Sequence, residues 1–477
     1  MRHQTTRGWL LAALVALSLS VIAFAGALQG PQPAASGKQA WLRQQGRPAA
    51  SFEEPQVRQA TPRARPAYAP GHVVVKFEPQ LRLRDVRQIA GEAGATRVTR
   101  ARYADFHYVE IPAGEDPVAA AARLNAEPGV LYAEPDPIVR ANWTPNDSLY
   151  RIQWNLQRIK MDTAWDINRG GSTKVTVAIL DTGVAYLNQG AFAQAPELAG
   201  TRFVAGWDFI WGDDQPVDTD GHGTHIAGTI AQVTDNQAGT AGMAFNVNIM
   251  PVKVLDTEWD EEQGAPFTAT MSVVAQGIRW AADHGAKVIN MSLGAESGSA
   301  TVETALRYAV GQGAFIAISA GNTGDEDNAP EWPATYARGI DGVMAVAAVD
   351  YNFKRAAYST HRDYVEIAAP GGDNGADANN DTRPDGILQQ TLDPTFQEQG
   401  IFNRFAYMYY QGTSMATAHV TGLAALLMDQ GITSPAAIEA AIKRFASDQP
   451  SAGGRNDDLG YGVIDARATL FGLGLAR

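Results

Sequence analysis

The chain of 477 residues contains no cysteine, so neither a disulfide bond nor a thiolate nucleophile or metal ligand is part of its chemistry. After its first residues it also lacks any apolar run long enough to cross a bilayer, which takes about 20 residues. It does have 45% hydrophobic residues and 47 glycines, enough for a large core with many tight turns. If such a chain is exported, packing and bound metal must supply the stability that disulfides give many exported proteins.

Charge is distributed unevenly along the chain. Residues 1–140 hold 17 Lys+Arg against 12 Asp+Glu, a net of +5, whereas residues 141–477 hold 21 against 39, a net of −18. The opposite signs predict two separable segments that attract each other. The acidic larger segment lacks the basic surface that nucleic-acid binding requires, so no nucleic-acid partner is expected. Acidic loops of this kind suit calcium.

Residues 1–25 have the pattern of a secretory signal peptide. Arg2, His3 and Arg7 precede an apolar run from Trp9 to Phe24, and the sequence Ala-Phe-Ala at residues 23–25 matches a cleavage site. The run is short for a membrane span, which favours cleavage over an uncleaved anchor. The sequence therefore predicts a secreted protein, extracellular or periplasmic, with no stable membrane span once the signal is removed.

Residues 26–67 are rich in Pro, Gln and Ala without periodicity, which predicts a flexible linker. Residues 68–142 predict a small α/β domain. Its strands and helices are expected, in order, at Val73–Phe77, Leu83–Ala93 (helix), Thr96–Ala101, Phe106–Ile111, Pro117–Ala126 (helix) and Val130–Ala133. The order β-α-β-β-α-β is that of a ferredoxin-like fold.

Residues 143–477 alternate short apolar runs with longer helical stretches. The expected strands are Val175–Leu180, Ile249–Leu255, Val288–Met291, Ala314–Ala320 and Val343–Val349. The expected helices are Gly223–Gln232, Ala269–His284, Val302–Gln312 and Ser414–Asp429. Strands that are apolar on both faces and separated by helices predict a mostly parallel sheet flanked by helices on both sides. In such sheets, sites form at the carboxyl ends of the strands.

Three residues stand at the positions where an α/β fold places chemistry. Asp181 directly follows a predicted strand, an arrangement that is common in this fold class. His222 stands where a loop enters a helix, whose N-terminus disfavours the imidazolium ion; a capping role explains it equally well. Ser414 begins a helix whose unpaired N–H groups can stabilise an oxyanion, although an isolated serine there is usually an ordinary N-cap.

The chain order Asp181, His222, Ser414 is one of the known orders of a serine-hydrolase triad. His225 does not complete an H-E-x-x-H motif, so a zinc protease is excluded. Two other hypotheses stay open: a catalytically inactive relative that acts as a binding protein, and a non-proteolytic hydrolase such as an esterase. Esterases normally carry a G-x-S-x-G motif, which is absent around Ser414.

Five short segments are distinctive, and three of them contain Asp181, His222 or Ser414. They are VAILDTGV at 177–184, GHGTHIAGT at 221–229, INMSLG at 289–294, SAGN at 319–322 and GTSMAT at 412–417. Together they resemble the subtilisin family of serine proteases, the subtilases, and within it the thermitase-like branch. The resemblance extends from about Trp143 to the C-terminal region, and residues 68–142 more weakly resemble the family's propeptide. One departure is Ala418, where the family usually has proline; alanine suits a helix at least as well.

The resemblance implies an endopeptidase that forms an acyl-enzyme and needs no cofactor for catalysis. Ser414 would attack the peptide carbonyl, His222 would act as general base and then acid, and Asp181 would orient His222. Asn322 and the backbone N–H of Ser414 would form the oxyanion hole. The segment Ser292, Leu293, Gly294 would pair with the main chain of an extended substrate, which favours broad specificity.

The resemblance also implies a zymogen. The propeptide domain would assist folding and block the site until it is cut, between Arg140 and Asp147, leaving residues 143–477 as the peptidase domain. The expected partners are protein or peptide substrates and the chain's own propeptide, and the mature enzyme is expected to be a monomer.

Three sets of oxygen-bearing residues are candidate calcium sites. The first aligns with a site of thermitase-like enzymes, with Glu197 in place of the usual Asp, and comprises Asp147, Glu197, Val233, Asn236, Ala238 and Thr240. The second, Asp208 and Asp213, has Trp211 where an acidic ligand is expected. The third lies in the insertion 371–411 and comprises Asp377, Asn379, Asp381 and Asp385. It lacks the Gly and terminal Glu of an EF-hand, so a solvated acidic loop explains it equally well.

Overall fold

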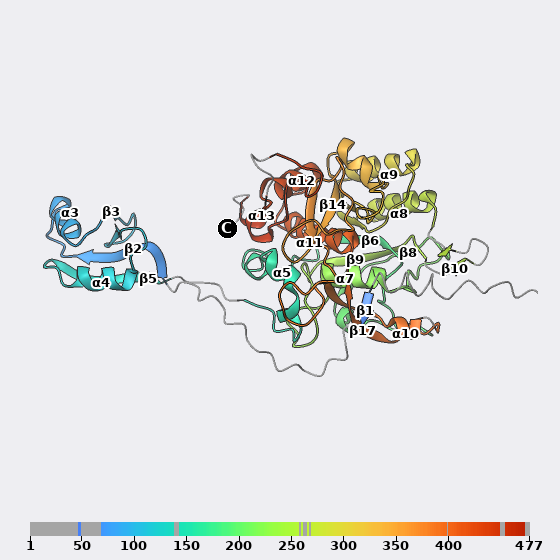
Figure 1. The fold of residues 1–477 in the computed structure, drawn as a ribbon, viewed down its shortest axis with the longest axis horizontal. Coiled ribbons are helices and arrows are strands. Elements are labelled where there is room, and N and C mark those ends of the chain that lie inside the picture. Colours follow the sequence, from blue (N-terminus) through green and yellow to red (C-terminus); the bar gives the residue numbers. More distant parts are fainter. Residues whose placement is uncertain are drawn as a thin grey trace, which may run out of the picture. The chain divides into compact units, whose positions relative to one another are not determined.

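The computed structural model describes residues 46–48, 68–137, 143–256, 259–260, 265–266, 269–397, 399–448 and 454–472. These residues form two compact units: residues 68–137 belong to one, and everything from Trp143 onward belongs to the other, together with strand β1 (Gly46–Pro48) (Figure 1). The predicted signal peptide and nearly all of the predicted linker lie outside the described residues, as do residues 138–142 near the expected cut.

The smaller unit is a four-stranded antiparallel sheet with two helices. Its elements are β2 (Tyr68–Phe77), α3 (Leu83–Glu92), β3 (Arg97–Arg100), β4 (His107–Glu110), α4 (Pro117–Asn125) and β5 (Val130–Pro137). The strand order β3-β4-β2-β5 is the predicted ferredoxin-like arrangement. Alternate residues Val73, Val75 and Phe77 pack in one core with Val86 of α3 and Leu124 of α4. The period of two along β2 therefore gives the sheet one apolar face, which the helices cover.

The larger unit is built on a parallel sheet, as the sequence predicts. The order across it is β15 (Ile367–Pro370), β14 (Val343–Val349), β13 (Phe315–Ser319), β12 (Val288–Met291), β6 (Thr176–Asp181), β9 (Asn248–Lys253) and β7 (Arg202–Phe203), and β8 (Trp207–Asp208) also pairs with β9. Every described pairing among these strands is parallel. The predicted bounds of these strands, and of the helices that flank the sheet, agree with the observed bounds to within a few residues.

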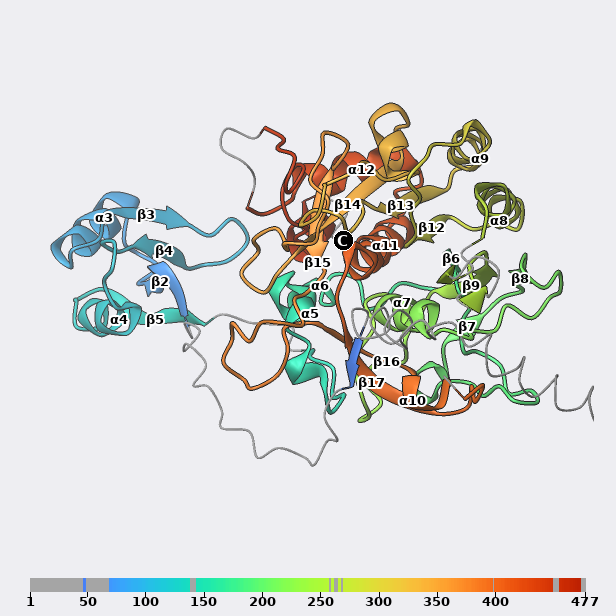
Figure 2. The same cartoon turned by 45° about the vertical axis from the view of Figure 1, so that its right-hand side comes forward.

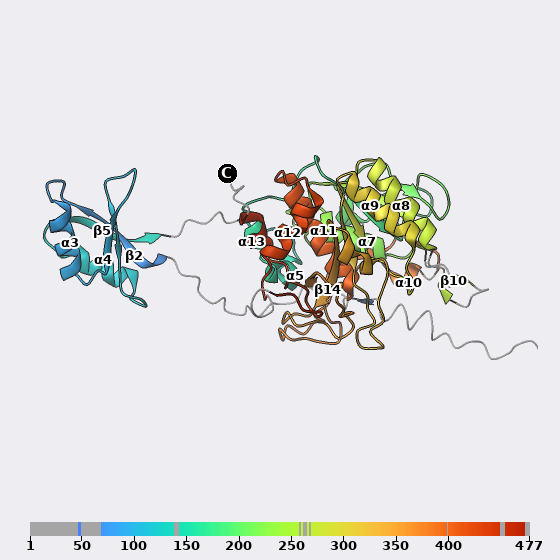
Figure 3. The ribbon, with the colours of Figure 1, turned by 90° about the horizontal axis from the view of Figure 1, so that it is seen from above.

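Helices cover both faces of this sheet (Figure 2). On one face, Val177 and Ile179 of β6 share a core with α7 (His222–Ala231) and α11 (Thr413–Asp429). On the other face, Ala178 and Leu180 pack with α8 (Met271–Asp283) and α9 (Ala300–Gly311), which lie side by side (Figure 3). Because successive side chains of β6 point to opposite faces, a run that is apolar throughout is what this layering requires.

The remaining described elements surround this frame. They are the α-helices α5 (Trp154–Arg158), α6 (Met161–Ala164), α10 (Pro394–Gln397), α12 (Pro435–Arg444) and α13 (Ala466–Phe471), three 3₁₀ helices (Tyr150–Ile152, Pro196–Leu198, Ala334–Gly339) and the small strands β10 (Trp259–Asp260) and β11 (Ala265–Pro266). In the described parts of the chain, no helix is both long and apolar enough to cross a membrane.

Part of the insertion at 371–411 folds as an antiparallel hairpin, which the sequence analysis did not predict. Its strands are β16 (Ile387–Leu392) and β17 (Phe405–Tyr410), and β1 pairs antiparallel with β17, with Gly46 opposite Tyr410. Residues 46–48 thus form a strand inside the stretch for which composition predicted a flexible linker. The hairpin leads directly into the Gly412–Ser414 turn and α11.

Candidate active site

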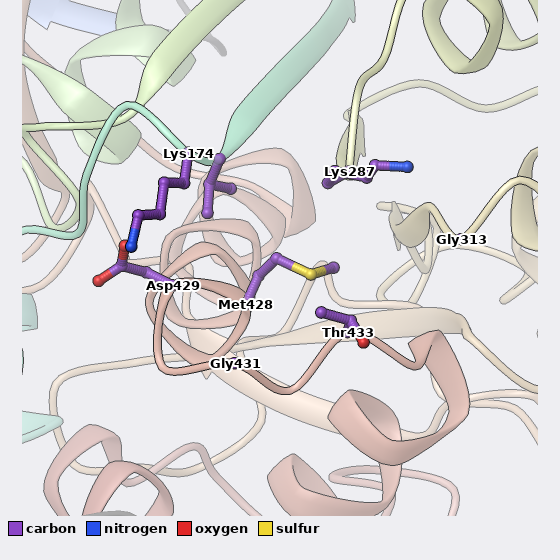
Figure 4. Close-up of a pocket in the computed structure, with 8 residues that line it drawn as sticks. Lys174, Lys287, Gly313, Met428, Asp429, Gly431 and Thr433 are labelled. Atoms are coloured by element: carbon purple, nitrogen blue, oxygen red, sulfur yellow. The ribbon is translucent and has the colours of Figure 1, made fainter. Parts of the chain in front are cut away.

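The carboxyl ends of neighbouring parallel strands bring the predicted site residues to one edge of the sheet. Asp181 is the last residue of β6, Ser292–Gly294 follow β12, and Asn322 comes three residues after β13. The opposite edge holds a pocket of about 380 Å³, where Val175 precedes β6 and Lys287 precedes β12 (Figure 4). This pocket lies at the amino ends of the strands and is therefore separate from the candidate site.

Asp181 and His222 form a directly bonded pair. Nδ1 of His222 lies 2.7 Å from Oδ1 of Asp181, which is completely buried, and the backbone N–H of Thr182 donates to the same oxygen at 2.8 Å. A carboxylate held in this way fixes both the orientation of the imidazole and the nitrogen that carries its proton.

Carboxylates dominate the electrostatics of His222. Burial lowers the pKa of its imidazole, but the charge and hydrogen bond of Asp181, with Asp220 and Asp218 adding, raise it to about 9. The N-terminus of α7, expected to keep the ring neutral, is thus outweighed by three acidic residues. In the substrate-free protein the imidazole binds a proton more tightly than an ordinary histidine does.

Asp218 organises the loop before α7, and the sequence analysis did not single it out. Its Oδ1 accepts hydrogen bonds from the hydroxyl of Thr182 at 2.9 Å and from the N–H of Gly221 at 2.8 Å, and its Oδ2 accepts from the N–H of Thr224 at 2.9 Å. One buried carboxylate therefore connects the residue after Asp181 with the first turn of the helix that carries His222. An acidic residue four positions before a helical histidine was the available signal.

Lys253 is a second residue that sequence analysis missed. It is fully buried at the end of β9, and its Nζ donates to the carbonyl of Thr182 at 2.8 Å and to the hydroxyl of Thr219 at 3.0 Å. A buried ammonium group is tolerated only when it is hydrogen-bonded and has counter-charge nearby, which Asp256 supplies at 3.7 Å. Lys253 thus supports the loops on both sides of the Asp181–His222 pair.

Ser414 is the second residue of α11, which packs against α7. Its side chain is partly exposed. Among the described residues, no hydrogen bond joins its hydroxyl to His222. The structure thus pairs His222 with Asp181 and shows no partner for the Ser414 hydroxyl within the described ranges. Hydrogen bonds of this kind often close only when substrate is present.

Asn322 and the N–H of Ser414 flank one small space. The side-chain oxygen of Asn322 accepts from the N–H of Thr413 at 2.9 Å and from its hydroxyl at 3.0 Å, which leaves Nδ2 as a donor. A β-carbon added to Gly412 would lie 3.7 Å from Nδ2 of Asn322 and 3.7 Å from the Ser414 nitrogen. Glycine keeps this space open, and its φ of 150° suits no other residue well. Two donor nitrogens that border the same space can bind an anionic oxygen there.

The segment Ser292–Gly294 is anchored to the same helix. The Ser292 hydroxyl donates to the Ser414 carbonyl at 3.0 Å, and the Ser319 hydroxyl donates to the Leu293 carbonyl at 3.3 Å. Gly294 itself is exposed. The segment is therefore held next to Ser414, and its end is exposed to solvent. An extended peptide can pair only with a segment that is exposed in this way.

The first predicted calcium set fits a cation. The structure brings Asp147 and Glu197 to the loop Val233–Thr240: Oδ2 of Asp147 accepts from the Asp235 N–H at 2.7 Å, and Oε2 of Glu197 accepts from the Thr240 N–H at 3.0 Å. Oδ1 of Asp147 is buried without a partner. Burial raises the pKa of both carboxyl groups, and the charge of Asp147 raises that of Glu197 further. The side-chain oxygen of Asn236 accepts from the Ala238 N–H at 2.8 Å, within the same loop.

The second calcium set has one buried oxygen without a partner, Oδ2 of Asp208, but it also has a cationic side chain nearby. Oδ1 of Asp208 accepts from the N–H groups of Ile210 and Trp211 at 2.7 and 2.9 Å. Burial raises the pKa of Asp208, although these hydrogen bonds and the ammonium group of Lys253 oppose the rise. That ammonium group also lies 5.1 Å from the centre of the Trp211 ring. A cationic side chain thus already faces the position where the metal was considered.

The third calcium set is closed mostly on its own backbone. Asp377 and Asn379 both accept from the N–H of Asp381, at 2.9 and 2.8 Å, and Oδ2 of Asp385 accepts from the Ala378 N–H. Oδ1 of Asp385 is buried and unpaired. Over the described ranges, no group of three or more His, Asp or Glu side chains is placed to hold a metal, so any calcium would need backbone and amide oxygens as well.

Comparisons with known proteins agree with the geometry. A family model described as the subtilase family matches residues 172–462, and one described as the fervidolysin N-terminal prodomain matches residues 54–136. Thermitase of Thermoactinomyces vulgaris is 38% identical over 305 residues, covering 64% of this chain and 92% of thermitase. A thermophilic serine proteinase of Bacillus sp. (strain AK1) is 36% identical over 366 residues, covering 76% and 79%. The solved structure of a protease from Pseudoalteromonas arctica has a TM-score of 0.57 at 31% identity and covers 69% of this chain and 99% of that one.

Proposed function

The chain belongs to the subtilase family of serine proteases and carries its own prodomain, and from this premise we propose that it is a secreted endopeptidase whose triad is Asp181, His222 and Ser414. The observation that carries the proposal is the 2.7 Å bond between His222 Nδ1 and buried Asp181, beside the helix that bears Ser414. This bond leaves Nε2 of the imidazole free to take a proton from a serine hydroxyl.

In the first half of the reaction, the Ser414 oxygen attacks the carbonyl carbon of the scissile peptide bond and its proton passes to Nε2 of His222. Asp181 stabilises the imidazolium that forms, which its effect on the pKa of His222 supports. The proton then goes to the leaving amine, and the C–N bond breaks. In the second half, His222 activates a water molecule that hydrolyses the acyl-enzyme.

The negative charge that develops on the carbonyl oxygen is bound by Nδ2 of Asn322 and the N–H of Ser414. Support comes from the space beside Gly412: a β-carbon placed there would lie 3.7 Å from each of the two donor nitrogens. Thr413 holds the oxygen end of the Asn322 amide, so the donor needs no reorganisation when the charge appears.

The substrate would lie extended along Ser292, Leu293 and Gly294. Main-chain hydrogen bonds to this segment would fix the register of the peptide relative to Ser414 without selecting a sequence. The bond from the Ser292 hydroxyl to the Ser414 carbonyl ties the position of the peptide to that of the nucleophile.

The test of this proposal is casein hydrolysis by the mature protein, with a fluorophosphonate probe to label the nucleophile. We expect hydrolysis and labelling in the wild type, and loss of both in Ser414→Ala. Labelling without cleavage of any protein or peptide would favour an esterase, and no labelling of the mature chain would favour an inactive binding protein. Either result would overturn the proposal.

The prodomain makes a zymogen the natural precursor, and we propose that Ser414 itself makes the cut between Arg140 and Asp147 after export. The signal pattern at residues 1–25 and the opposite charges of the two segments support this route. Mass spectrometry of the secreted product gives the mature N-terminus. A mature protein that still begins within residues 26–67 would contradict it.

We also propose a structural calcium ion held by Asp147, Glu197 and the loop Val233–Thr240. The buried, unpaired Oδ1 of Asp147 and the mutually repelling carboxyl groups support a cation at this place. Its part would be to neutralise two buried charges and to hold the loop to the N-terminal segment of the peptidase domain, with no role in proton transfer.

A further inference from the structure

Glu331 has its carboxylate at the candidate site, although no motif pointed to it. Its Oε1 accepts the backbone N–H of Asn322 at 3.0 Å. A β-carbon added to Gly294 would come within 2.1 Å of Oε2, and one added to Gly321 within 2.4 Å of Oε1. The carboxylate therefore lies between the predicted substrate-pairing segment and the turn that carries Asn322. It occupies space that side chains at both glycines would otherwise fill.

This carboxylate has no cation of its own. Among the described residues, no Lys, Arg or His pairs with Glu331, and its one interaction that favours the charge is the Asn322 N–H. Burial raises the pKa of Glu331 above its ordinary value, so its charged form is held at a cost. Half-buried charges are normally paired within the protein, and an unpaired one beside a binding segment indicates that a ligand supplies the partner.

Oε2 faces the binding side. The Asn322 N–H fixes Oε1, and Oε2 lies against the Cα of Gly294, an exposed residue with no side chain to cover it. The loop that follows Asn322 adds three exposed acidic residues, Asp325, Glu326 and Asp327. The charge at this end of the site is thus negative, which attracts cations.

The position of the attacked carbonyl decides which part of a substrate meets Glu331. If the carbonyl oxygen binds between Nδ2 of Asn322 and the Ser414 nitrogen, the residue that owns it lies beside Ser292–Gly294. Its side chain then enters the space between that segment and residues 320–322, the turns that follow the neighbouring strands β12 and β13. Glu331 contacts both walls of this space.

We propose that Glu331 selects a cationic side chain, lysine or arginine, at the substrate residue whose carbonyl Ser414 attacks. This inference rests on the proposed function and deepens it, because broad main-chain pairing would then be combined with one charged contact. Oε2 accepts a hydrogen bond from the ammonium or guanidinium group, while Oε1 keeps the Asn322 N–H.

The experiment compares peptides that differ only at that residue, cleaved by the mature enzyme. Lysine and arginine are set against methionine, which has similar length and no charge. We expect kcat/KM for lysine or arginine to exceed that for methionine by about 10- to 100-fold, the range for one hydrogen bond to a charged group. A lysine preference no greater than that for methionine would overturn the inference.

The variant that tests the residue is Glu331→Gln, which keeps an oxygen for the Asn322 N–H and removes the charge. We expect the preference to disappear, so that the ratio of kcat/KM for the lysine or arginine peptide to kcat/KM for the methionine peptide falls to about one. The matched control, Glu296→Gln, removes a charge from a nearby exposed position and should preserve the preference. If Glu331→Gln lowers kcat/KM equally for all peptides, Glu331 acts by positioning Asn322, and the inference that it selects a cationic side chain is overturned.

A second measurement needs no turnover. Reversible peptide aldehydes that end in arginine or norleucine can be compared by their inhibition constants. The arginine aldehyde should bind the wild type more tightly than the norleucine aldehyde, and Glu331→Gln should bind both equally. Hydrolysis of methionine peptides without a basic preference would overturn this inference alone. Failure to cleave any peptide, with Ser414→Ala indistinguishable from wild type, would overturn the proposed function and this inference together.

Discussion

Asn322 shows how much one side chain depends on its neighbours at the residue scale. Thr413 donates twice to the amide oxygen of Asn322, so Nδ2 is left as the donor that the proposed oxyanion site requires. The orientation is therefore set in the free protein, and the donor contributes fully when negative charge develops.

Replacing Asn322 by alanine removes that donor. We predict that Asn322→Ala lowers kcat by about 10²- to 10³-fold and changes KM little, since the interaction forms mainly in the transition state. Steady-state kinetics on a peptide anilide measures both constants. Thr413→Val, which removes one of the two bonds that orient the amide, should lose much less. A large rise in KM with unchanged kcat in Asn322→Ala would refute the assignment.

The pH profile depends on the acidic residues around His222. Because its raised pKa, about 9, means that the base is protonated over much of the neutral range, kcat/KM should rise with pH on a limb above 6.5. Asp220→Asn keeps an oxygen that accepts from the backbone N–H of His222, but it removes one of the charges that raise the pKa of the imidazole. We predict that the limb moves to lower pH by on the order of 0.5 unit.

The control for this shift is Asp341→Asn. It removes the same charge from an exposed residue that is not among the groups that shift the pKa of His222. Its limb should coincide with that of the wild type. A limb in Asp220→Asn that stays in place or moves to higher pH would mean that another group controls the profile.

At the scale of elements, α11 is a helix surrounded by protein. Every residue from Met415 to Met428 is buried, and a β-carbon on Gly422 would lie 2.9 Å from Cβ of Met243. Glycine in this helix interior is therefore a packing requirement, although its helix propensity is poor. In α9, by contrast, a β-carbon on Gly311 would meet nothing within 4 Å.

These two glycines give opposite predictions for the same substitution. Gly422→Ala should lower the free energy of unfolding by about 1–3 kcal/mol through overpacking against Met243. Gly311→Ala should leave it unchanged or raise it by up to about 1 kcal/mol through helix propensity. Thermal unfolding of the two variants beside the wild type measures the difference. Equal shifts in both would show that packing around α11 is looser than the structure has it.

The sequence predicts some elements far better than others, for physical reasons. Strands such as Val343–Val349 are buried on both faces, so their apolar runs identify them without any tertiary information. The hairpin β16–β17 was missed because its segment begins with Asp, Asn and Gly and its buried face includes Gln389 and Thr391. The hydroxyl of Thr391 donates to the Gly221 carbonyl, next to His222, a contact across 170 residues that no local pattern reveals.

The candidate site divides in the same way. Asp181, His222 and Ser414 are predictable because each adjoins a strand end or helix start and their order is distinctive. Lys253 donates to the Thr182 carbonyl across 71 residues, and Asp218 accepts from the Thr182 hydroxyl across 36 residues. Glu331 accepts from the Asn322 N–H, which belongs to a different turn. An isolated acidic or basic residue carries no sign of such a partner. Those roles become visible only when the loops are placed around them.

At the scale of the whole molecule, a protein without disulfides depends on other cross-links. A calcium ion at Asp147 and Glu197 would join the start of the peptidase domain to the Val233–Thr240 loop. We predict that a chelator lowers Tm of the mature protein by about 5–10 °C, the effect of losing roughly 2.7 kcal/mol of ligand stabilisation. Asp147→Asn should remove most of this difference, and Asp377→Asn should leave it intact.

The same site sets the direction of a pH effect. Because the pKa values of Asp147 and Glu197 are raised, ionisation of the metal-free fold is unfavourable, and its stability falls as pH rises from the ordinary carboxyl pKa through the raised values. The calcium-dependent gain in Tm should therefore be larger at pH 7 than at pH 5, where protons compete with the ion. A chelator effect that is the same at both values would place the metal elsewhere.

Once residues 1–25 are removed, the propeptide (residues 26–142) has 15 Lys+Arg against 12 Asp+Glu, a net of +3, and the peptidase segment has a net of −18. The positive excess lies in residues 26–67, which hold 6 Lys+Arg against 2 Asp+Glu. This difference predicts how activity appears during maturation. If attraction between these charges helps to hold the cut propeptide to the enzyme, salt should weaken that attraction, since it screens charges over about 10 Å at 0.1 M. Activity of freshly processed wild-type protein should thus appear faster in 0.5 M than in 0.05 M NaCl, because the screening length is about threefold shorter at the higher salt concentration. The activity of samples taken at intervals after processing, measured on a peptide substrate, gives the time at which activity appears. Enzyme that has already lost its prodomain is the control for direct effects of salt on activity. Onset that is independent of salt would mean that apolar contacts alone hold the prodomain in place.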